Sequence, residues 1–181
     1  MKWLVLVVPS VVAVIAAQNQ PQKPLPKYDS PMLYFEDHCQ RCHGENGANY
    51  SPELGKGKDD AWLLQEITDM AEGPGQSPLE KDALLAQAAF HRSLIAKEPF
   101  LFITGYAKGV LSGETLPGAK VTAMVGKKTF PAKVKEKTWT VVLPATTAVR
   151  SISVQAKLND KLTKLSLDKG WYSHSQTLSK K

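Results

Sequence analysis

The stretch EDHCQRCHGENG, residues 36 to 47, contains both cysteines of the chain and decides how the first half of the sequence is interpreted. Cys39 and Cys42 are separated by two residues, and His43 follows the second cysteine directly. Two thiols and an imidazole at this spacing are typical of a redox pair, a metal site or covalent haem attachment.

The residues around this stretch separate the three possibilities. A thioredoxin-like pair follows a strand, whereas the preceding MLYFEDH, residues 32 to 38, has the apolar spacing of a helix. Zinc needs four ligands, and the remaining histidines match no common zinc finger. They are His38, His91 and His174. Haem attachment needs only two thiols, which add across the porphyrin vinyl groups, and an imidazole for the iron. The sequence therefore predicts one covalently attached haem c on Cys39 and Cys42, with His43 as the proximal iron ligand.

Residues 31 to 96 resemble a class I cytochrome c domain, because the run CHGENG matches the pattern of that family around its haem. The resemblance implies three helices around one haem, bound through Cys39, Cys42 and His43. It also implies that an aromatic residue of the closing helix packs across the first helix, and Phe90 is the candidate.

Two further helices are predicted before residue 97. DDAWLLQEITDMAEG, residues 59 to 73, has apolar residues at helical spacing and opens with two acids, which suit the positive end of a helix. The segment from Ser77 to Ala96 is predicted as the closing helix. Ser77 is its candidate N-cap and Pro78 its first residue.

The resemblance to cytochromes c fails at the sixth iron ligand. The family usually has a Met-Pro pair before the closing helix, where this chain has Ser77-Pro78. Met70, beside the glycine-rich turn EGPGQ, is the first candidate for the distal ligand, although methionine also fills irregular gaps in a core. His91 is the alternative, although it shares an apolar stripe of the closing helix. If neither binds, an open position would admit small ligands to the iron.

The second half of the sequence predicts strands. Short runs of β-branched and aromatic residues are separated by turn signals. These runs are PFLFITGYA (99–107), AKVTAMVG (119–126), TFPAKVK (129–135), TWTVVLP (138–144), VRSISVQAKL (149–158) and KLTKLSL (161–167). The segment LSGETLPG (111–118) is interpreted as a turn.

Residues 99 to 168 resemble bacterial Ig-like modules, because a Pro-Gly-Ala turn precedes a strand and Trp139 falls in a later strand before "LP". The resemblance implies a small antiparallel sandwich with Trp139 in its core and a binding or spacing role by analogy. Together the two resemblances imply a two-domain fold: an all-α cytochrome c domain and an all-β Ig-like sandwich.

The first seventeen residues, MKWLVLVVPSVVAVIAA, are predicted to be a signal peptide, with one lysine, an apolar run and small residues at its end. The run is short for a membrane span of about 20 residues, and no cysteine follows it directly to take a lipid. We expect a periplasmic or secreted protein with no stable membrane span after cleavage. The predicted organisation is a signal peptide (1–17), a Pro/Gln-rich linker (18–31), the cytochrome c domain (32–97), the Ig-like domain (98–169) and a tail (170–181).

Charge divides the two halves. Residues 18 to 96 carry seven Lys or Arg against twelve Asp or Glu, and residues 97 to 181 carry fifteen against five. The difference suits steering of a redox partner by one half and contact of the other half with an acidic surface or polymer. Nucleic acid is not an expected partner, because the lysines are spread through strands without clustered aromatics.

The favoured function is electron transfer, without enzymatic activity, to a redox protein partner such as a larger periplasmic oxidoreductase. The Ig-like half would dock the haem domain to that partner or to a surface. Two alternatives stay open. One is an open-site haem protein that binds or reduces peroxide or a diatomic gas, and the other is an adhesion or polymer-binding module with an accessory haem.

Overall fold

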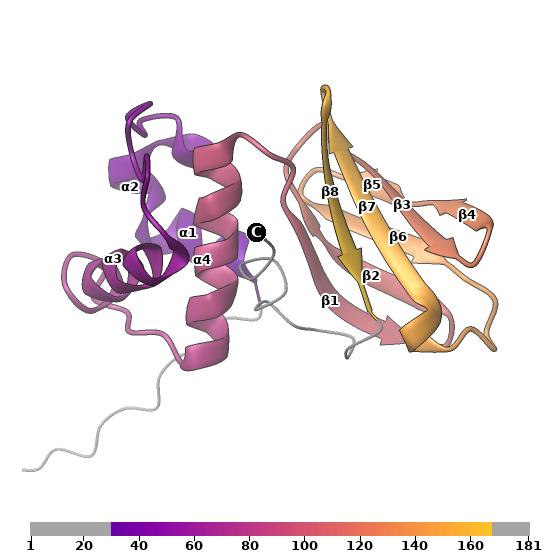
Figure 1. The fold of residues 1–181 in the computed structure, drawn as a ribbon. Coiled ribbons are helices and arrows are strands. Elements are labelled where there is room, and N and C mark those ends of the chain that lie inside the picture. Colours follow the sequence, from indigo (N-terminus) through magenta and orange to yellow (C-terminus); the bar gives the residue numbers. More distant parts are fainter. Residues whose placement is uncertain (1–29, 168–181) are drawn as a thin grey trace, which may run out of the picture.

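The computed structural model describes residues 30–167 of the 181-residue chain. The predicted signal peptide, residues 18 to 29 of the linker and the tail lie outside the described residues. Within them, the helices occupy the first half and lie to one side of two β-sheets (Figure 1). The helices are α1 (Pro31–His38), α2 (Gln40–His43), α3 (Asp60–Glu72) and α4 (Lys81–Ala96), with short 3₁₀ turns at Glu45–Gly47 and Val149–Ser151.

Helix α1 leads into the cysteines, as MLYFEDH predicted. The Ser30 side chain caps its first turn by accepting a hydrogen bond from the Leu33 N–H at 2.9 Å, and Pro31 opens the helix, where its missing N–H costs nothing. Cys39 ends α1, and its N–H donates to the Phe35 carbonyl. The cysteines are therefore held by a helix whose inner face is buried.

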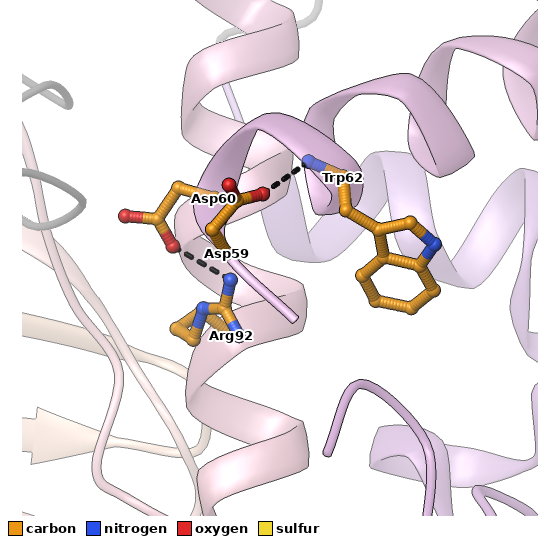
Figure 2. A network of polar contacts seen from close by, with 4 residues as sticks. All are labelled: Asp59, Asp60, Trp62 and Arg92. Carbon is orange, nitrogen blue, oxygen red and sulfur yellow. Dashed lines mark hydrogen bonds and ion pairs between the residues drawn. The ribbon is translucent and has the colours of Figure 1, made fainter. Parts of the chain in front are cut away.

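Helix α3 confirms the prediction for residues 59 to 73. The Asp59 carboxylate caps it by accepting from the Trp62 N–H at 2.9 Å (Figure 2). The neighbouring Asp60 forms an ion pair with Arg92 of α4, with 2.6 Å between Oδ1 and an Nη atom. The two acids thus divide their roles, because one stabilises the helix start and the other joins α3 to α4.

Helix α4 begins later than predicted, so Ser77 as its N-cap is wrong. The helix starts at Lys81, after Glu80, whose side chain makes no capping bond. Ser77 is buried and belongs to the preceding connection: its N–H donates to the Ala71 carbonyl, and its carbonyl accepts from the Tyr34 hydroxyl at 2.7 Å. Bonds to α3 and α1 therefore outcompete the local capping signal.

The strands form two four-stranded antiparallel sheets. Their bounds are β1 (Leu101–Ala107), β2 (Val110–Thr115), β3 (Lys120–Val125), β4 (Lys128–Pro131), β5 (Lys133–Lys135), β6 (Thr138–Val142), β7 (Ile152–Leu158) and β8 (Lys161–Ser166). The first sheet has the order β1-β2-β6-β5 and the second the order β4-β3-β7-β8. The run predicted as one strand over 129–135 is divided between the two sheets, with the crossing at Ala132.

Strand β2 covers residues 111 to 115 of the segment that was predicted as a turn, so that part of the prediction is wrong, and the turn is confined to Pro117 and Gly118. Gly113 of β2 has a packing role: a Cβ there would lie 1.9 Å from the Phe102 carbonyl oxygen and 2.4 Å from the Trp139 ring. The glycine therefore makes room for the tryptophan of the neighbouring strand β6 and does not mark a turn.

The two sheets pack face to face around one apolar core. Trp139 is at its centre, 1% exposed, and its indole N–H donates to the Glu114 carbonyl at 3.0 Å. The other fully or nearly buried members come from both sheets and include Leu101, Ile103, Leu111, Val121, Ala123, Val141, Ile152, Val154 and Ala156.

A second apolar cluster joins the helices to the sheets, and it corrects the predicted fold class. Phe90 of α4 makes edge contacts with Phe35 of α1 (5.4 Å between ring centroids) and with Phe100 before β1 (4.9 Å). Phe102 and Leu116 complete this shared cluster. The described residues therefore form one mixed α/β protein with four α-helices and two antiparallel sheets, and no separate all-α cytochrome c domain is evident.

Polar contacts cross the same boundary. Glu36 of α1 forms an ion pair with Lys137 beside β6. Burial raises the pKa of the Glu114 carboxyl of β2, and interactions with Ser30 and with the Met32 N–H at the start of α1 oppose this shift. The sheet half therefore fixes the orientation of the helix that carries the cysteines.

No helix within residues 30–167 combines the length and the apolar character needed to cross a bilayer.

Candidate functional site

A cavity of about 150 Å³ lies among the helices beside the two cysteines. Its walls come from all four α-helices and the loop after α2. The lining residues include Cys39, Cys42, His43, Tyr50, Leu63, Ile67, Met70 and His91. All five predicted site residues are among them, so the fold brings together side chains that are up to 52 positions apart in the sequence.

Local backbone hydrogen bonds hold the cysteines and His43 in place. The N–H groups of Cys42 and His43 both donate to the Cys39 carbonyl, at 3.1 and 3.0 Å. The Asn49 side-chain amide donates to the Cys42 carbonyl at 3.2 Å, and the Asn49 backbone N–H donates to the His43 carbonyl at 2.9 Å. The loop after α2 therefore folds back and fixes this segment from the other side.

The two thiols differ in their surroundings. Cys39 is partly buried and Cys42 is exposed, and they form no disulfide. Burial, together with the neighbouring Cys42, raises the pKa of the Cys39 thiol to about 11. Since thiolates attack disulfides and bind metal ions, a protonated Cys39 is poorly suited to dithiol redox exchange at neutral pH.

His91 lies on α4 and is buried in the cavity wall. Its Nδ1 lies 2.6 Å from the Tyr50 hydroxyl, and its Nε2 is buried without a hydrogen-bond partner. Burial, and to a smaller degree the charge of His43, lowers the pKa of His91 to about 3. His91 is therefore neutral at physiological pH, with one ring nitrogen satisfied and the other available.

Tyr50 is the site residue that the sequence did not reveal. Its ring contacts both imidazoles, with centroid distances of 5.0 Å to His43 and 6.0 Å to His91. Burial raises the pKa of its phenol, so the hydroxyl stays protonated. The available signal was Gly47, since a Cβ at that position would lie 2.8 Å from the Tyr50 ring. A glycine three residues before an aromatic is too common to identify such a contact alone.

Met70 and His38 also line the cavity, in different settings. Met70 is on α3 and its side chain is 38% exposed, so it lies at the mouth. His38 has its Nδ1 3.3 Å from the Gly75 carbonyl oxygen and its ring against Tyr34. These contacts tie His38 to α1 and to the turn that follows α3.

The chemistry of this donor set fits a covalently held haem. Two thiols with an adjacent imidazole, apolar walls and a buried imidazole nitrogen without a partner meet in one space. The cavity must widen before it can hold a haem, because a volume of about 150 Å³ is enough only for a molecule of the size of benzene. A porphyrin is several times larger, so side chains at the exposed edge of the cavity, such as Met70, must move outward to admit it.

No family model, no curated protein and no solved structure matches the chain. In the part of the chain that the structure describes, no group of three or more His, Cys, Asp or Glu side chains could hold a metal ion. These findings overturn the predicted class I cytochrome c domain and leave the resemblance to Ig-like modules without support. Haem attachment is a separate prediction, because haem iron takes only one or two protein ligands.

Proposed function

We propose that the chain carries one haem, bound through thioether bonds to Cys39 and Cys42, and transfers electrons to a redox protein partner. The observation that carries the proposal is the cavity, which collects both thiols, His43 and the unpartnered Nε2 of His91 in one largely apolar space. Family membership plays no part in this proposal.

Each wall of the cavity has a role in such a carrier. Bound haem would supply an iron that alternates between ferrous and ferric states. His43 is suited to ligation because burial lowers its pKa and keeps the imidazole neutral. Leu63 and Ile67, both nearly buried, exclude water and lower the local dielectric constant. No side chain needs to act as an acid or base, because electron transfer requires only rigid ligands and one accessible edge.

His91 is better supported than Met70 as the distal ligand. With Nδ1–H donating to the Tyr50 oxygen, Nε2 carries the lone pair that can bind iron. Histidines that bind metals are usually held in this way, by a hydrogen bond from their other ring nitrogen. Met70 has no comparable support and is partly exposed. We therefore propose that His43 and His91 would bind the haem iron, with Tyr50 holding the His91 ring.

Optical spectra of haem-loaded variants test this choice. Met70→Leu is expected to leave the spectrum unchanged, and His91→Met is expected to create a methionine–ferric charge-transfer band or an open site. A methionine band in the unmodified protein that disappears in Met70→Leu would reverse the assignment. Circular dichroism of each variant confirms that the helices are retained.

A second candidate function is binding of a small ligand at an open iron position. It would apply if neither His91 nor Met70 reached the iron, because one iron position would then stay vacant. Carbon monoxide added to the reduced protein separates the two functions. A closed pair of imidazoles resists carbon monoxide, whereas an open site shifts the Soret band at once.

Charge supports a basic redox partner. Residues 30 to 96 carry five Lys or Arg against eleven Asp or Glu, so the helical half has a net charge of −6. Such a charge attracts a basic partner at a rate that falls as salt rises. We further propose that the chain is exported before haem attachment, in accordance with its apolar N-terminal run. A fusion of residues 1–30 to an export reporter tests that step.

A further inference from the structure

The outer face of the second sheet carries a group of lysines that the proposed haem site does not use. Along β3 and β7, the buried residues Val121, Ala123, Val154 and Ala156 point into the core. Since side chains alternate along a strand, their neighbours point outward. Lys120 of β3 and Lys157 of β7 are such neighbours, and both are exposed. Lys164 of β8 is also exposed on this face.

The strand register brings these lysines close together. Lys120 lies directly opposite Lys157. Lys164 lies opposite Gln155, so it is a diagonal neighbour of Lys157. Opposite residues in antiparallel strands have Cβ atoms about 5 Å apart, and diagonal neighbours are about 7 to 8 Å apart. We call Lys120, Lys157 and Lys164 the lysine row.

The lysine row has no acidic neighbour on its face. The other outward residues of β3, β7 and β8 are neutral: Thr122, Met124, Ser153, Gln155, Leu162 and Ser166. None of the three lysines forms an ion pair within residues 30–167. Like charges directly opposite each other destabilise a sheet, so the pair of Lys120 and Lys157 is electrostatically unfavourable in the free protein. An anion on this face would relieve that repulsion.

We propose that the lysine row binds a linear anionic polymer. A row of lysines whose Cβ atoms are about 5 to 8 Å apart can place its ammonium groups on successive anionic groups of one chain. Thr122 and Gln155 form the next pair along these strands, beside the lysines, and offer hydrogen bonds to phosphate or carboxylate oxygens.

A bilayer and a nucleic acid fit this face less well. Leu162 is the one exposed large apolar residue on it among the described residues, which is too little to enter a bilayer interface. The face also has no aromatic side chain or arginine, on which nucleic-acid bases would stack. The surroundings add general attraction, since residues 97 to 167 carry twelve Lys or Arg against four Asp or Glu.

Binding of inorganic polyphosphate to the full chain tests the proposal, measured by fluorescence anisotropy with labelled polymer at two salt concentrations. We expect K120Q/K157Q/K164Q to weaken binding about tenfold or more. The matched control K56Q/K58Q/K81Q removes three exposed lysines of the helical half, and we expect its affinity to stay within about twofold. Equal weakening in both variants, or none in the first, would overturn the proposal.

Two further measurements separate polymer binding from membrane binding and test the repulsion within the lysine row. Vesicles containing phosphatidylglycerol replace the polymer in a parallel titration, and binding to vesicles with no binding to polyphosphate also overturns the proposal. Thermal unfolding at low salt should show a higher Tm for Lys120→Gln than for the unmodified protein, since the opposed charges are removed. Neither measurement needs haem, so failure here is distinguishable from failure of the proposed electron carrier.

Discussion

The sheet half and the helical half of this protein differ in how completely they fill their interiors. Between the sheets, Leu111, Ala123, Trp139 and Val154 are at most 1% exposed and belong to one continuous core. Among the helices, the apolar residues form two separate clusters, one shared with Phe100 and Phe102 and one around Leu63 and Ile67. The cavity lies beside them.

The two halves therefore differ in how much of their apolar packing lies within the half itself. The sheets bury their apolar residues against each other, whereas α1 and α4 bury theirs partly against Phe100, Phe102 and Leu116. The helical half therefore obtains order from two sources: the sheet residues that it contacts and, in the proposed function, a haem in its cavity. Variants in each half test this dependence of the helices on the sheets.

Trp139→Ala should cause the largest loss of stability. It removes the largest side chain of the sheet core and the indole hydrogen bond to the Glu114 carbonyl. Aromatic-to-alanine changes in cores cost about 3 to 5 kcal/mol, and we expect a value near the upper end from urea unfolding followed by circular dichroism. A loss below about 1 kcal/mol would show that the sheet core is not the stable unit described here.

Phe102→Ala should uncouple the two halves at a cost of about 3 kcal/mol. Phe102 is on β1 but packs with the helical cluster, so the variant should increase amide exchange in α4 more than in β3 and β7. Val142→Ala is the control, because Val142 is 73% exposed. Faster exchange confined to the strands would mean that the halves fold independently.

His91 should make the haem-free protein less stable in acid. Its pKa is about 3 in the folded state against an ordinary value of 6.5, so below pH 6.5 the unfolded chain binds a proton that the folded chain does not. Stability is then complete above pH 6.5 and falls with acidification, by at most about 1.4 kcal/mol per pH unit.

His91→Leu isolates this contribution from other titrating groups. Glu114 acts in the opposite sense, because its raised pKa lets the folded state take up a proton first and gain stability as pH falls. The difference in unfolding free energy between the unmodified protein and His91→Leu should therefore change with pH between 7 and 5. Parallel curves would mean that His91 titrates normally and is not buried as described.

Asp60→Asn should have the smallest effect, about 0.5 kcal/mol. It breaks the ion pair between Asp60 of α3 and Arg92 of α4. The Asp60 side chain is 36% exposed and the Arg92 side chain 25%, so water screens their attraction. The loss should shrink further at high salt. A loss above about 2 kcal/mol would show that α3 depends on this pair more than on the packing of Leu63 and Ile67.

The sequence predicted local structure well where periodicity and burial agree. The α1 and α3 predictions hold because their apolar spacing matches the buried face, and Phe90 contacts Phe35 as expected. Strand β2 was missed because its Gly113 is a packing requirement of Trp139 that only the folded structure shows. Ser77 was misassigned because its bonds are made to distant segments.

Longer-range features were harder to predict. Spacing alone placed Cys39, Cys42 and His43 together, but it favoured Met70 over His91 as the distal ligand, and only the folded structure shows the unpartnered Nε2 of His91. The contact of Tyr50 with both histidines joins residues 41 positions apart, and no local pattern encodes it. The division into two domains was wrong for a related reason, because Phe100 and Phe102 resemble ordinary strand residues and yet complete a helical cluster.

Haem attachment is decided by the intact mass of protein produced in cells with periplasmic haem-attachment machinery. We expect the polypeptide mass plus one haem, retained after denaturation and lost in Cys39→Ser/Cys42→Ser. A mass equal to the polypeptide alone, or lighter by the two hydrogens of a disulfide between Cys39 and Cys42, would contradict it.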